Sequence, residues 1–250
     1  MEGLQREIAD EARFQDALEF DPRVLTNPLE SASTATTGDR EQPVVAGVDQ
    51  SFLLEDEPER ALSAIVVMRG ETVLERVSAV TPLQIPYIPG LLAFREGGPI
   101  LEAMAELSVE PDLFLFDGSG RIHFRQAGIA THVGVVLDVP AVGVAKSLLC
   151  GAPSSTLEDL PTGSTVPIEA GDDSRVDAPA ETRLGYAVQT RQYESSNRHI
   201  NPLYVSPGHR VGAETAAALV VGCTAGYKLP EPIRLADAYA EEAKAEYPLE

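Results

Sequence analysis

Short apolar runs bounded by turn-forming residues recur along the chain and predict the strands of a buried sheet. Residues 113–116 (LFLF) and 44–48 (VVAGV) are the two clearest examples. Each run is followed directly by an aspartate, Asp117 in the first case and Asp49 in the second. A continuous apolar run is typical of a strand covered on both faces, although the run alone does not exclude a buried helix.

The remaining pattern alternates between strand-like and helix-like segments. Residues 64–68 and 72–80 predict two strands joined by a short turn at 69–71, so three successive strands form a meander. Further strands are expected at 141–144 and 184–190, and apolar spacing predicts helices at 4–20, 100–107, 126–137 and 212–223. A meander followed by helices and further strands predicts an α/β protein with a mixed sheet flanked by helices.

Two segments lack this periodicity. Residues 31–43 are small and polar and are interpreted as a linker, while residues 152–182 are rich in proline, acidic and small polar residues and are interpreted as a loop insertion. The chain of 250 residues is therefore expected to form a single domain, 1–250. Within it, residues 1–42 supply an N-terminal helix and linker, and 152–182 form an acidic insertion.

The net charge of −20 argues at first against a polyanionic partner. The acidic residues are concentrated in 1–60 and 151–182, whereas 183–230 carries a net positive charge. Lysine occurs at only three positions, Lys146, Lys228 and Lys244. We interpret the acidic, lysine-poor composition as a surface adapted to high salt, which leaves room for a locally basic groove.

Cysteine content and hydropathy indicate the cellular compartment. Cys150 and Cys223 are too few and too far apart for a disulfide framework or a zinc site. No apolar run approaches the roughly 18 residues that a membrane helix needs. The first residues, MEGLQREIADEARF, are charged throughout and lack the apolar core of a signal peptide. A cytoplasmic protein without membrane association is expected.

Several side chains stand where chemistry is often placed, and each also has a structural explanation. Asp117 precedes the Gly118-Ser119-Gly120 turn, and a carboxylate at the carboxyl end of a strand is where open α/β sheets hold ligands. It could equally cap a turn. Glu96 is typical of a solvated helix charge, Lys146 of a snorkelling surface residue, and Tyr87 of an ordinary proline loop.

Six blocks together resemble one known family. They are VAGVDQS around Asp49, PYIPGLLAFREGGP from Pro86, PDLFLFDGSGRIHFR from Pro111, GIATHVGVVLDVPAVGVAKSLL from Gly128, PLYVSPGH from Pro202 and LPEPIRLAD from Leu229. In this order they resemble endonuclease V, a family of repair nucleases with a ribonuclease H-like fold. Each block is weakly specific alone, whereas the set is highly specific and extends from residue 43 to residue 237.

The resemblance implies a magnesium-dependent phosphodiester hydrolase, with Mn²⁺ as a substitute ion. It implies Asp49 and Asp117 as direct ligands and Glu96 as a carboxylate that acts through metal-bound water. His209 is expected near the metal water or the leaving group, and Lys146 is expected to offset phosphate charge. The chemistry is consistent, because Mg²⁺ prefers carboxylates and water and activates water for phosphodiester hydrolysis.

The resemblance also implies how a lesion is recognised. Tyr87, held in the stiff loop with Pro86, Ile88 and Pro89, would fill the stack left by a flipped base. The base would enter a pocket lined by Leu92, Gly118, Gly128, Ile129 and Ala145.

The expected activity is nicking of DNA at the second phosphodiester on the 3′ side of deoxyinosine, leaving 3′-hydroxyl and 5′-phosphate ends. The expected partner is damaged, deoxyinosine-containing DNA, bound by a monomer. The alternatives are the same chemistry on inosine-containing RNA and a lesion-binding protein that does not cut.

Overall fold

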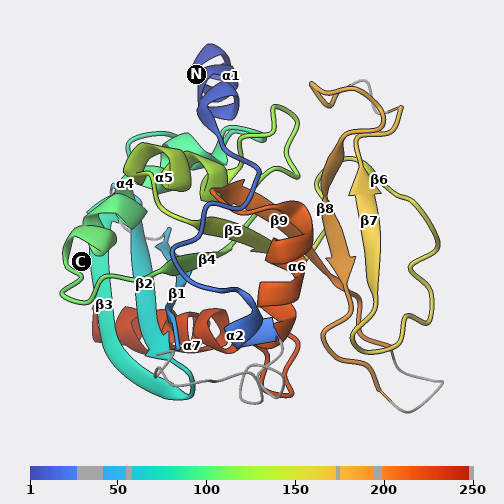
Figure 1. Cartoon of the computed structure of the whole chain (residues 1–250). Coiled ribbons are helices and arrows are strands. Elements are labelled where there is room, and N and C mark those ends of the chain that lie inside the picture. The colour runs from blue at the N-terminus through green and yellow to red at the C-terminus, as the bar shows by residue number, and fades with distance from the viewer. Residues whose placement is uncertain (27–41, 55–57, 173–174, 194–198, 248–250) are drawn as a thin grey trace.

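A single mixed sheet of nine strands runs through the molecule, and helices cover both faces of its central part (Figure 1). The structure is a computed structural model, and it describes residues 1–26, 42–54, 58–172, 175–193 and 199–247. The strands lie in the order β3-β2-β1-β4-β5-β9-β8-β7-β6. Their bounds are β1 (Val44–Leu53), β2 (Arg60–Arg69), β3 (Thr72–Pro82), β4 (Leu113–Asp117), β5 (Ala141–Ala145), β6 (Ala152–Pro153), β7 (Thr165–Glu169), β8 (Arg183–Val188) and β9 (Leu203–His209).

The middle of the sheet consists of parallel strands, and the edges are antiparallel. β1 pairs with β4 and β4 with β5 in parallel, whereas β1, β2 and β3 form an antiparallel meander and β9 runs antiparallel to β5. Consecutive residues of β1 and β4 point to opposite faces of the sheet, and both faces are buried. This explains the continuous apolar runs, because a strand covered on both sides shows no alternation.

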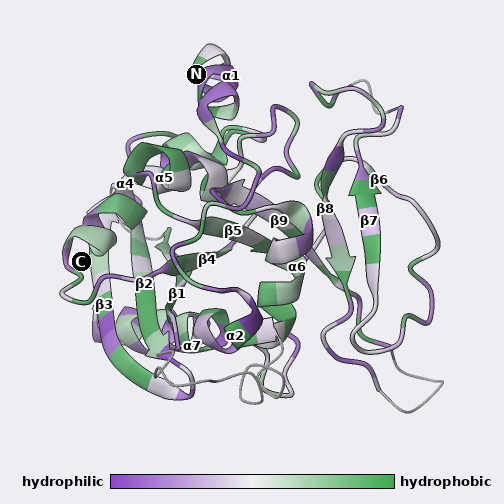
Figure 2. Cartoon of the chain, viewed as in Figure 1, coloured by the Kyte–Doolittle hydropathy of each residue, from purple (hydrophilic) through white to green (hydrophobic). Residues whose placement is uncertain are grey.

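The helices divide between the two faces. Their bounds are α1 (Glu2–Glu11), α2 (Arg23–Thr26), α4 (Leu92–Ala105), α5 (Ile129–Leu137), α6 (Ala213–Gly222) and α7 (Glu231–Glu246). On one face, α4 and α5 bury side chains against Val48, Phe114 and Phe116. On the other face, α6 and α7 pack on Val45 and Leu115, together with other residues of the same cluster. Figure 2 shows the matching hydropathy, with β2 largely hydrophobic and α1 largely hydrophilic.

The predicted mixed α/β architecture and the meander are confirmed, but three local predictions need correction. The helix expected at 4–20 ends at Glu11, because the following segment pairs its backbone with Arg210, directly after β9, instead. The Arg210 N–H donates to the carbonyl of Arg13 at 2.7 Å, and the Ala17 N–H donates to the carbonyl of Arg210 at 2.9 Å. Tertiary pairing thus replaces helical hydrogen bonds. The linker predicted at 31–43 lies mostly outside the described residues.

The other two corrections concern proline-containing segments. The helix expected at 100–107 already begins at Leu92 and includes Gly97, Gly98 and Pro99, because its buried face continues through them. The segment 152–182, interpreted as a loop, contains β6 and β7. Its buried residues form a small core beneath β7 and β8 that includes Val166, Ile168 and Leu184. Short edge strands without regular alternation do not produce a recognisable sequence pattern.

Helix α7 crosses β1 at unusually short range, and a glycine makes this possible. A Cβ added at Gly47 would lie 2.1 Å from the backbone carbon and oxygen of Pro232, in the first turn of α7. Real Cβ atoms do not approach backbone so closely, so only glycine permits this packing. The contact determines where the rest of α7 lies relative to the carboxyl half of β1.

We expect Gly47→Ala to push α7 away from the sheet and to destabilise the fold by roughly 1–3 kcal/mol, the range of an overpacked core. Thermal or urea unfolding measures the loss. The matched control is Gly3→Ala on α1, where an added Cβ meets no atom within 4 Å. That change is expected to stabilise the protein by about 0.5–1 kcal/mol through helix propensity. Equal effects of the two substitutions would contradict the close packing of α7.

Candidate metal-binding active site

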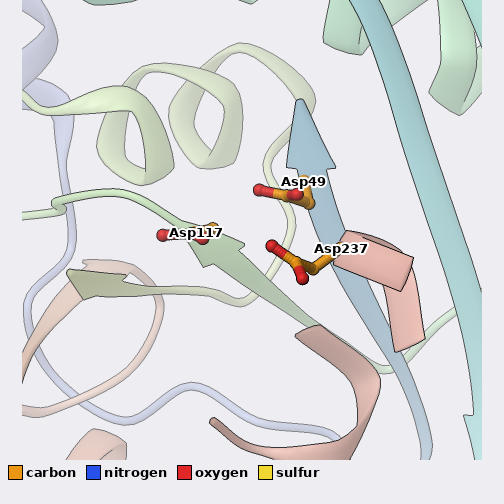
Figure 3. A group of neighbouring side chains, drawn as sticks. All are labelled: Asp49, Asp117 and Asp237. Carbon is orange, nitrogen blue, oxygen red and sulfur yellow. The ribbon is translucent and has the colours of Figure 1, made fainter. Parts of the chain in front are cut away.

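Three aspartates from distant parts of the chain meet at one end of the central strands. Asp49 comes from β1, Asp117 from β4 and Asp237 from α7, and Figure 3 shows their side chains gathered between these elements. One ligand oxygen from each of the three lies within 4.8 Å of the others. All three retain some contact with solvent, and the side chains of Asp117 and Asp237 are 15% and 49% exposed.

Sheet register explains why these three side chains meet. Val48 pairs with Phe116 in the parallel ladder, so Asp49 and Asp117 are the next residues on two adjacent strands. Both point to the face covered by α7, because Val45 and Leu115 on that same face pack in its core. Asp237 follows the buried Ala236 of α7, whose approach to β1 is fixed at Gly47.

The cluster has the donor chemistry that a hard divalent cation requires. An octahedral Mg²⁺ with oxygens at about 2.0–2.1 Å separates adjacent ligand oxygens by about 3 Å and opposite ones by about 4 Å. Separations within 4.8 Å therefore need only small side-chain movements to reach this geometry. Three carboxylates on one side leave the remaining positions for water or a phosphate oxygen.

A lysine neutralises part of this charge. The Nζ atom of Lys146 lies 2.7 Å from Oδ2 of Asp117 and 3.7 Å from Oδ1 of Asp237. Burial lowers the pKa of Lys146, but the hydrogen bond and the charge of Asp117, with the other aspartates, outweigh it and raise the pKa overall. The ammonium group therefore stays charged at the cluster.

The acidic groups repel one another and are poorly solvated. Burial, with the charge of Asp117, raises the pKa of Asp49 from 3.8 to about 7. Burial also raises the pKa of Glu96 to about 7, partly opposed by the adjacent Arg95. Asp49 and Asp117 both contribute to the shift of Glu96, so this carboxylate of α4 lies in their electrostatic field while standing outside the group of three.

The predicted wedge loop lies between β3 and α4 and is exposed. Tyr87 is 66% exposed and Ile88 37%, and Pro86 and Pro89 are exposed as well. The loop ends at Gly90, just before the helix that carries Glu96.

The five predicted pocket residues fall into two groups. Leu92, Gly118 and Ala145 are partly exposed, and the last two lie at the carboxyl ends of β4 and β5. Gly128 and Ile129 are buried at the start of α5, beneath the turn that follows Asp117. The groups are in contact, because a Cβ at Gly118 would lie 2.6 Å from Cγ2 of Ile129.

The prediction for His209 is not consistent with its position. His209 pairs with Ala141 at the start of β5, whereas Asp117 pairs with Val144 near its end. Three residues along a strand amount to roughly 10 Å. Its side chain is 4% exposed, Nε2 lies 2.9 Å from Oδ1 of Asp138, and Nδ1 accepts a hydrogen bond from the Arg13 N–H. His209 thus ties the N-terminal segment to the opposite end of the sheet.

Asp237 is the member of the cluster that sequence reasoning missed. It belongs to the LPEPIRLAD block, so a signal was present. The helical pattern offers a second signal, because Ile233, Ala236 and Ala240 form the buried stripe and Asp237 stands at its edge. A residue at the edge of the buried stripe lies at the border between sheet and solvent, where its carboxylate can reach the ends of the strands.

Comparisons with known proteins agree with this geometry. The family model for Endonuclease V matches residues 29–238. The Endonuclease V of Haloarcula marismortui is 57% identical, with 98% of this chain and 92% of that protein covered, and the one of Natronomonas pharaonis is 56% identical over 99% and 92%. The catalytic domain of human Endonuclease V has a TM-score of 0.77 at 31% identity, covering 98% of this chain and 94% of that one.

A more distant solved structure shares the fold. Endonuclease V from Ciona intestinalis has a TM-score of 0.72 at 24% identity, covering 98% of this chain and 96% of that one. That structure is a complex with a 24mer DNA containing an inosine followed by a ribo-adenosine.

The mixed sheet, its helices and the carboxylates at the ends of its central strands define a nuclease of the ribonuclease H-like fold. This is the fold that the sequence predicted. Over nearly its whole length the chain matches relatives at more than half identity, and it belongs to the Endonuclease V family. None of the helices in the described part of the chain is long and apolar enough to cross a membrane.

The raised pKa of Asp49 predicts that the free energy of unfolding falls as the pH rises. The folded state binds the proton of the Asp49 carboxyl group more tightly than the unfolded state, in which the pKa is near 3.8. The contribution of Asp49 to the free energy of unfolding is therefore lost as the pH rises through about 7. Asp49→Asn mimics the neutral form. Without metal, we expect it to raise stability at pH 8 by on the order of 1–3 kcal/mol, with no gain near pH 3.5.

Thermal unfolding at the two pH values, with and without divalent metal, measures this effect. Saturating Mg²⁺ should make the parent protein more stable than Asp49→Asn at pH 8, because the ion stabilises the folded chain only where it binds. Asp10→Asn, at an exposed position of α1, is the control for the substitution itself and should change stability little. A metal-free Asp49→Asn protein no more stable than the parent at pH 8 would contradict the inferred burial of charge.

Proposed function

We propose that the protein is a Mg²⁺-dependent endonuclease that nicks DNA at the second phosphodiester on the 3′ side of deoxyinosine, leaving 3′-hydroxyl and 5′-phosphate ends. The observation that carries the proposal is the convergence of Asp49, Asp117 and Asp237 in a chain of the Endonuclease V family. Mn²⁺ is the expected substitute ion, since it accepts the same carboxylate and water ligands.

Each charged residue of the site has a part in this proposal. Asp49, Asp117 and Asp237 would hold the cation, which when bound supplies an activated water and neutralises charge on the scissile phosphate. Glu96, which lies in the electrostatic field of Asp49 and Asp117, would accept a proton from the attacking water. Lys146, released from Asp117 once a cation takes that carboxylate, would contact the phosphate as a point charge.

Lesion recognition would use the exposed loop and the glycine turn. The ring of Tyr87, between Pro86, Ile88 and Pro89, would replace the flipped base in the stack. The base would enter between Leu92, Gly118 and Ala145, with Gly128 and Ile129 forming the floor. The Ciona protein of the same fold holds inosine-containing DNA, which supports this class of substrate.

Two other functions are weighed against this one. An endoribonuclease for inosine-containing RNA would need the same cation site and pocket, and would differ only in its contacts to the 2′-hydroxyl. A lesion-binding protein that does not cut is disfavoured, because a pure binder gains nothing from three clustered carboxylates beside a phosphate.

One nicking experiment separates the three functions. A duplex with a single deoxyinosine, a matched strand with ribo-inosine and an undamaged duplex are incubated with Mg²⁺ and with excess chelator. We expect metal-dependent nicking of the deoxyinosine duplex, and a loss of about 100-fold or more in Asp237→Asn, because a ligand of the cation is lost. Lesion binding should persist in that variant.

The matched control is Glu242→Gln on the same helix, whose exposed carboxylate lies 4.0 Å from Arg76 and away from the cluster. It should nick at the parental rate. Preferred cleavage of the ribo-inosine strand would favour the RNA function, and binding without nicking would favour the pure binder. Full nicking by Asp237→Asn would remove Asp237 from the cation site.

The acidic composition generates a prediction about salt. At a net charge of −20, acidic segments repel a duplex over a Debye length of roughly 30 Å at about 0.01 M salt and roughly 3 Å at about 1 M. Close contacts at the site are screened less than this long-range repulsion. We therefore expect the nicking rate to rise from low salt to an optimum at elevated KCl, at fixed Mg²⁺.

Circular dichroism recorded in parallel separates this effect from folding, since screening also relieves self-repulsion within the chain. Activity that falls steadily with KCl while the protein stays folded would show that the acidic surface is not an adaptation to salt.

A further inference from the structure

The N-terminal helix α1 lies outside the region that matches the family model, yet it packs against the rest of the molecule. The matched region begins at residue 29, whereas α1 spans Glu2–Glu11 and contacts α5 (Figure 1). Of its residues, only Gln5 and Ile8 are buried. A buried glutamine on a short, otherwise exposed helix requires a specific set of hydrogen bonds.

Both the nitrogen and the oxygen of the Gln5 amide form hydrogen bonds. Its Nε2 group donates to the carbonyl oxygen of Gly90 at 2.9 Å, and its Oε1 accepts from Nη1 of Arg125 at 3.0 Å. Arg125 also forms an ion pair with Glu2 of the same helix. Gln5, whose side chain is fully buried, therefore joins the loop before α4 to the segment that follows the glycine turn.

Gly90 is the last residue of the exposed loop that carries Tyr87. At the other end of that loop, Nη1 of the buried Arg95 donates to the carbonyl oxygen of Ile85 at 3.0 Å. Gly90 itself has φ +78°, a conformation that favours glycine and turns the chain sharply into α4. The four exposed residues 86–89 therefore lie between the carbonyl groups of Ile85 and Gly90, and each of these groups accepts a side-chain hydrogen bond.

His123 is a second group at the Gly90 end. It hydrogen-bonds the backbone of Gly90, and burial, with the charge of Arg125, lowers its pKa to about 4, so the ring is neutral. Its Nδ1 accepts from the Arg125 N–H at 3.2 Å. Gln5 differs from His123 in being supplied by α1, which precedes the residues that the family model matches.

We propose that α1 is a brace for the Tyr87 loop and that Gln5 is a positioning residue for lesion recognition. By holding Gly90 in place, Gln5 limits the positions that Tyr87 can adopt, and so favours the one suited to a vacated base stack over those that contact intact duplex. This inference rests on the proposed function for its consequence, whereas the brace itself is a structural claim that can be tested separately.

Gln5→Glu is the most informative variant. A glutamate of the same shape still accepts from Arg125, but its ionised carboxylate has no N–H to donate to Gly90. The variant therefore removes one of the two side-chain hydrogen bonds to Gly90 and leaves those of His123 and Arg125 in place. Gln5→Met removes the same donor without adding charge, and serves if the glutamate variant does not fold.

Two readouts are needed. Hydrogen exchange of the backbone amides in 86–94, which include the Leu91 N–H bonded to the carbonyl of Ile88, reports on the loop without any substrate. The ratio of nicking rates on deoxyinosine and undamaged duplex reports on recognition. We expect faster exchange and a ratio lowered roughly three- to tenfold, as for the loss of one hydrogen bond, with unchanged Mn²⁺ affinity. The Tyr87→Ala variant gives the ratio of nicking rates that is expected when the wedge is lost entirely.

The matched control is Arg6→Ala, which removes the exposed ion pair with Asp177 from the same helix and leaves Gln5 in place. It should leave both readouts unchanged. Unchanged exchange in the glutamate variant would overturn the brace, and faster exchange with an unchanged ratio would overturn the role in recognition. If the parent protein nicks no inosine substrate, the proposed function fails while the exchange result still decides the brace.

Discussion

The close approach of α7 to β1 is the contact on which the site depends. Gly47 allows the backbone of Pro232 to lie where any side chain would stand, and this sets the position of Asp237 next to Asp49. The strand register then adds Asp117, because β1 and β4 run in parallel and end their apolar segments at the same level. The Gly47 contact and the parallel pairing of β1 with β4 thus bring three carboxylates together, although the residues span almost 190 positions of the sequence.

Such an arrangement is costly for the fold and useful for catalysis. Burial and mutual repulsion raise the pKa values of Asp49 and Glu96 to about 7, so these carboxyl groups resist ionisation when no cation balances their charge. Lys146 offsets part of this cost through Asp117. A divalent cation would relieve the remainder, and the binding energy would come partly from charges that the protein already holds close together. The clustered carboxylates would thus lower the stability of the metal-free fold and raise its affinity for a divalent cation.

Local patterns in the sequence predicted the mixed α/β sheet, and the family resemblance added two of the three clustered aspartates. Asp49 and Asp117 directly follow apolar runs, and the sheet topology makes those runs neighbours. Asp237 lies on a helix whose position is set by a tertiary contact at Gly47, which no periodicity reveals. His209 was misplaced for the same reason, since its position depends on β9 running antiparallel to β5.

Other differences follow from long-range contacts too. The end of α1 is set by backbone pairing between the N-terminal segment and Arg210, and the short strands in 152–182 are stabilised by a small core that they share with β8. The role of Gln5 could not be predicted from its surroundings in sequence, which are those of a solvated amphipathic helix. Only the folded chain shows that this side chain reaches the loop before α4.

The most direct test of the account is the location of the bound cation. Crystals of the protein grown with Mn²⁺ at pH 8, and measured at the manganese absorption edge, reveal the ion by its anomalous scattering. We expect one principal peak between Asp49, Asp117 and Asp237, with carboxylate oxygens at about 2.1–2.2 Å and Lys146 moved away from Asp117. A fully occupied peak elsewhere, with these three carboxylates bound to no ion, would contradict the central claim.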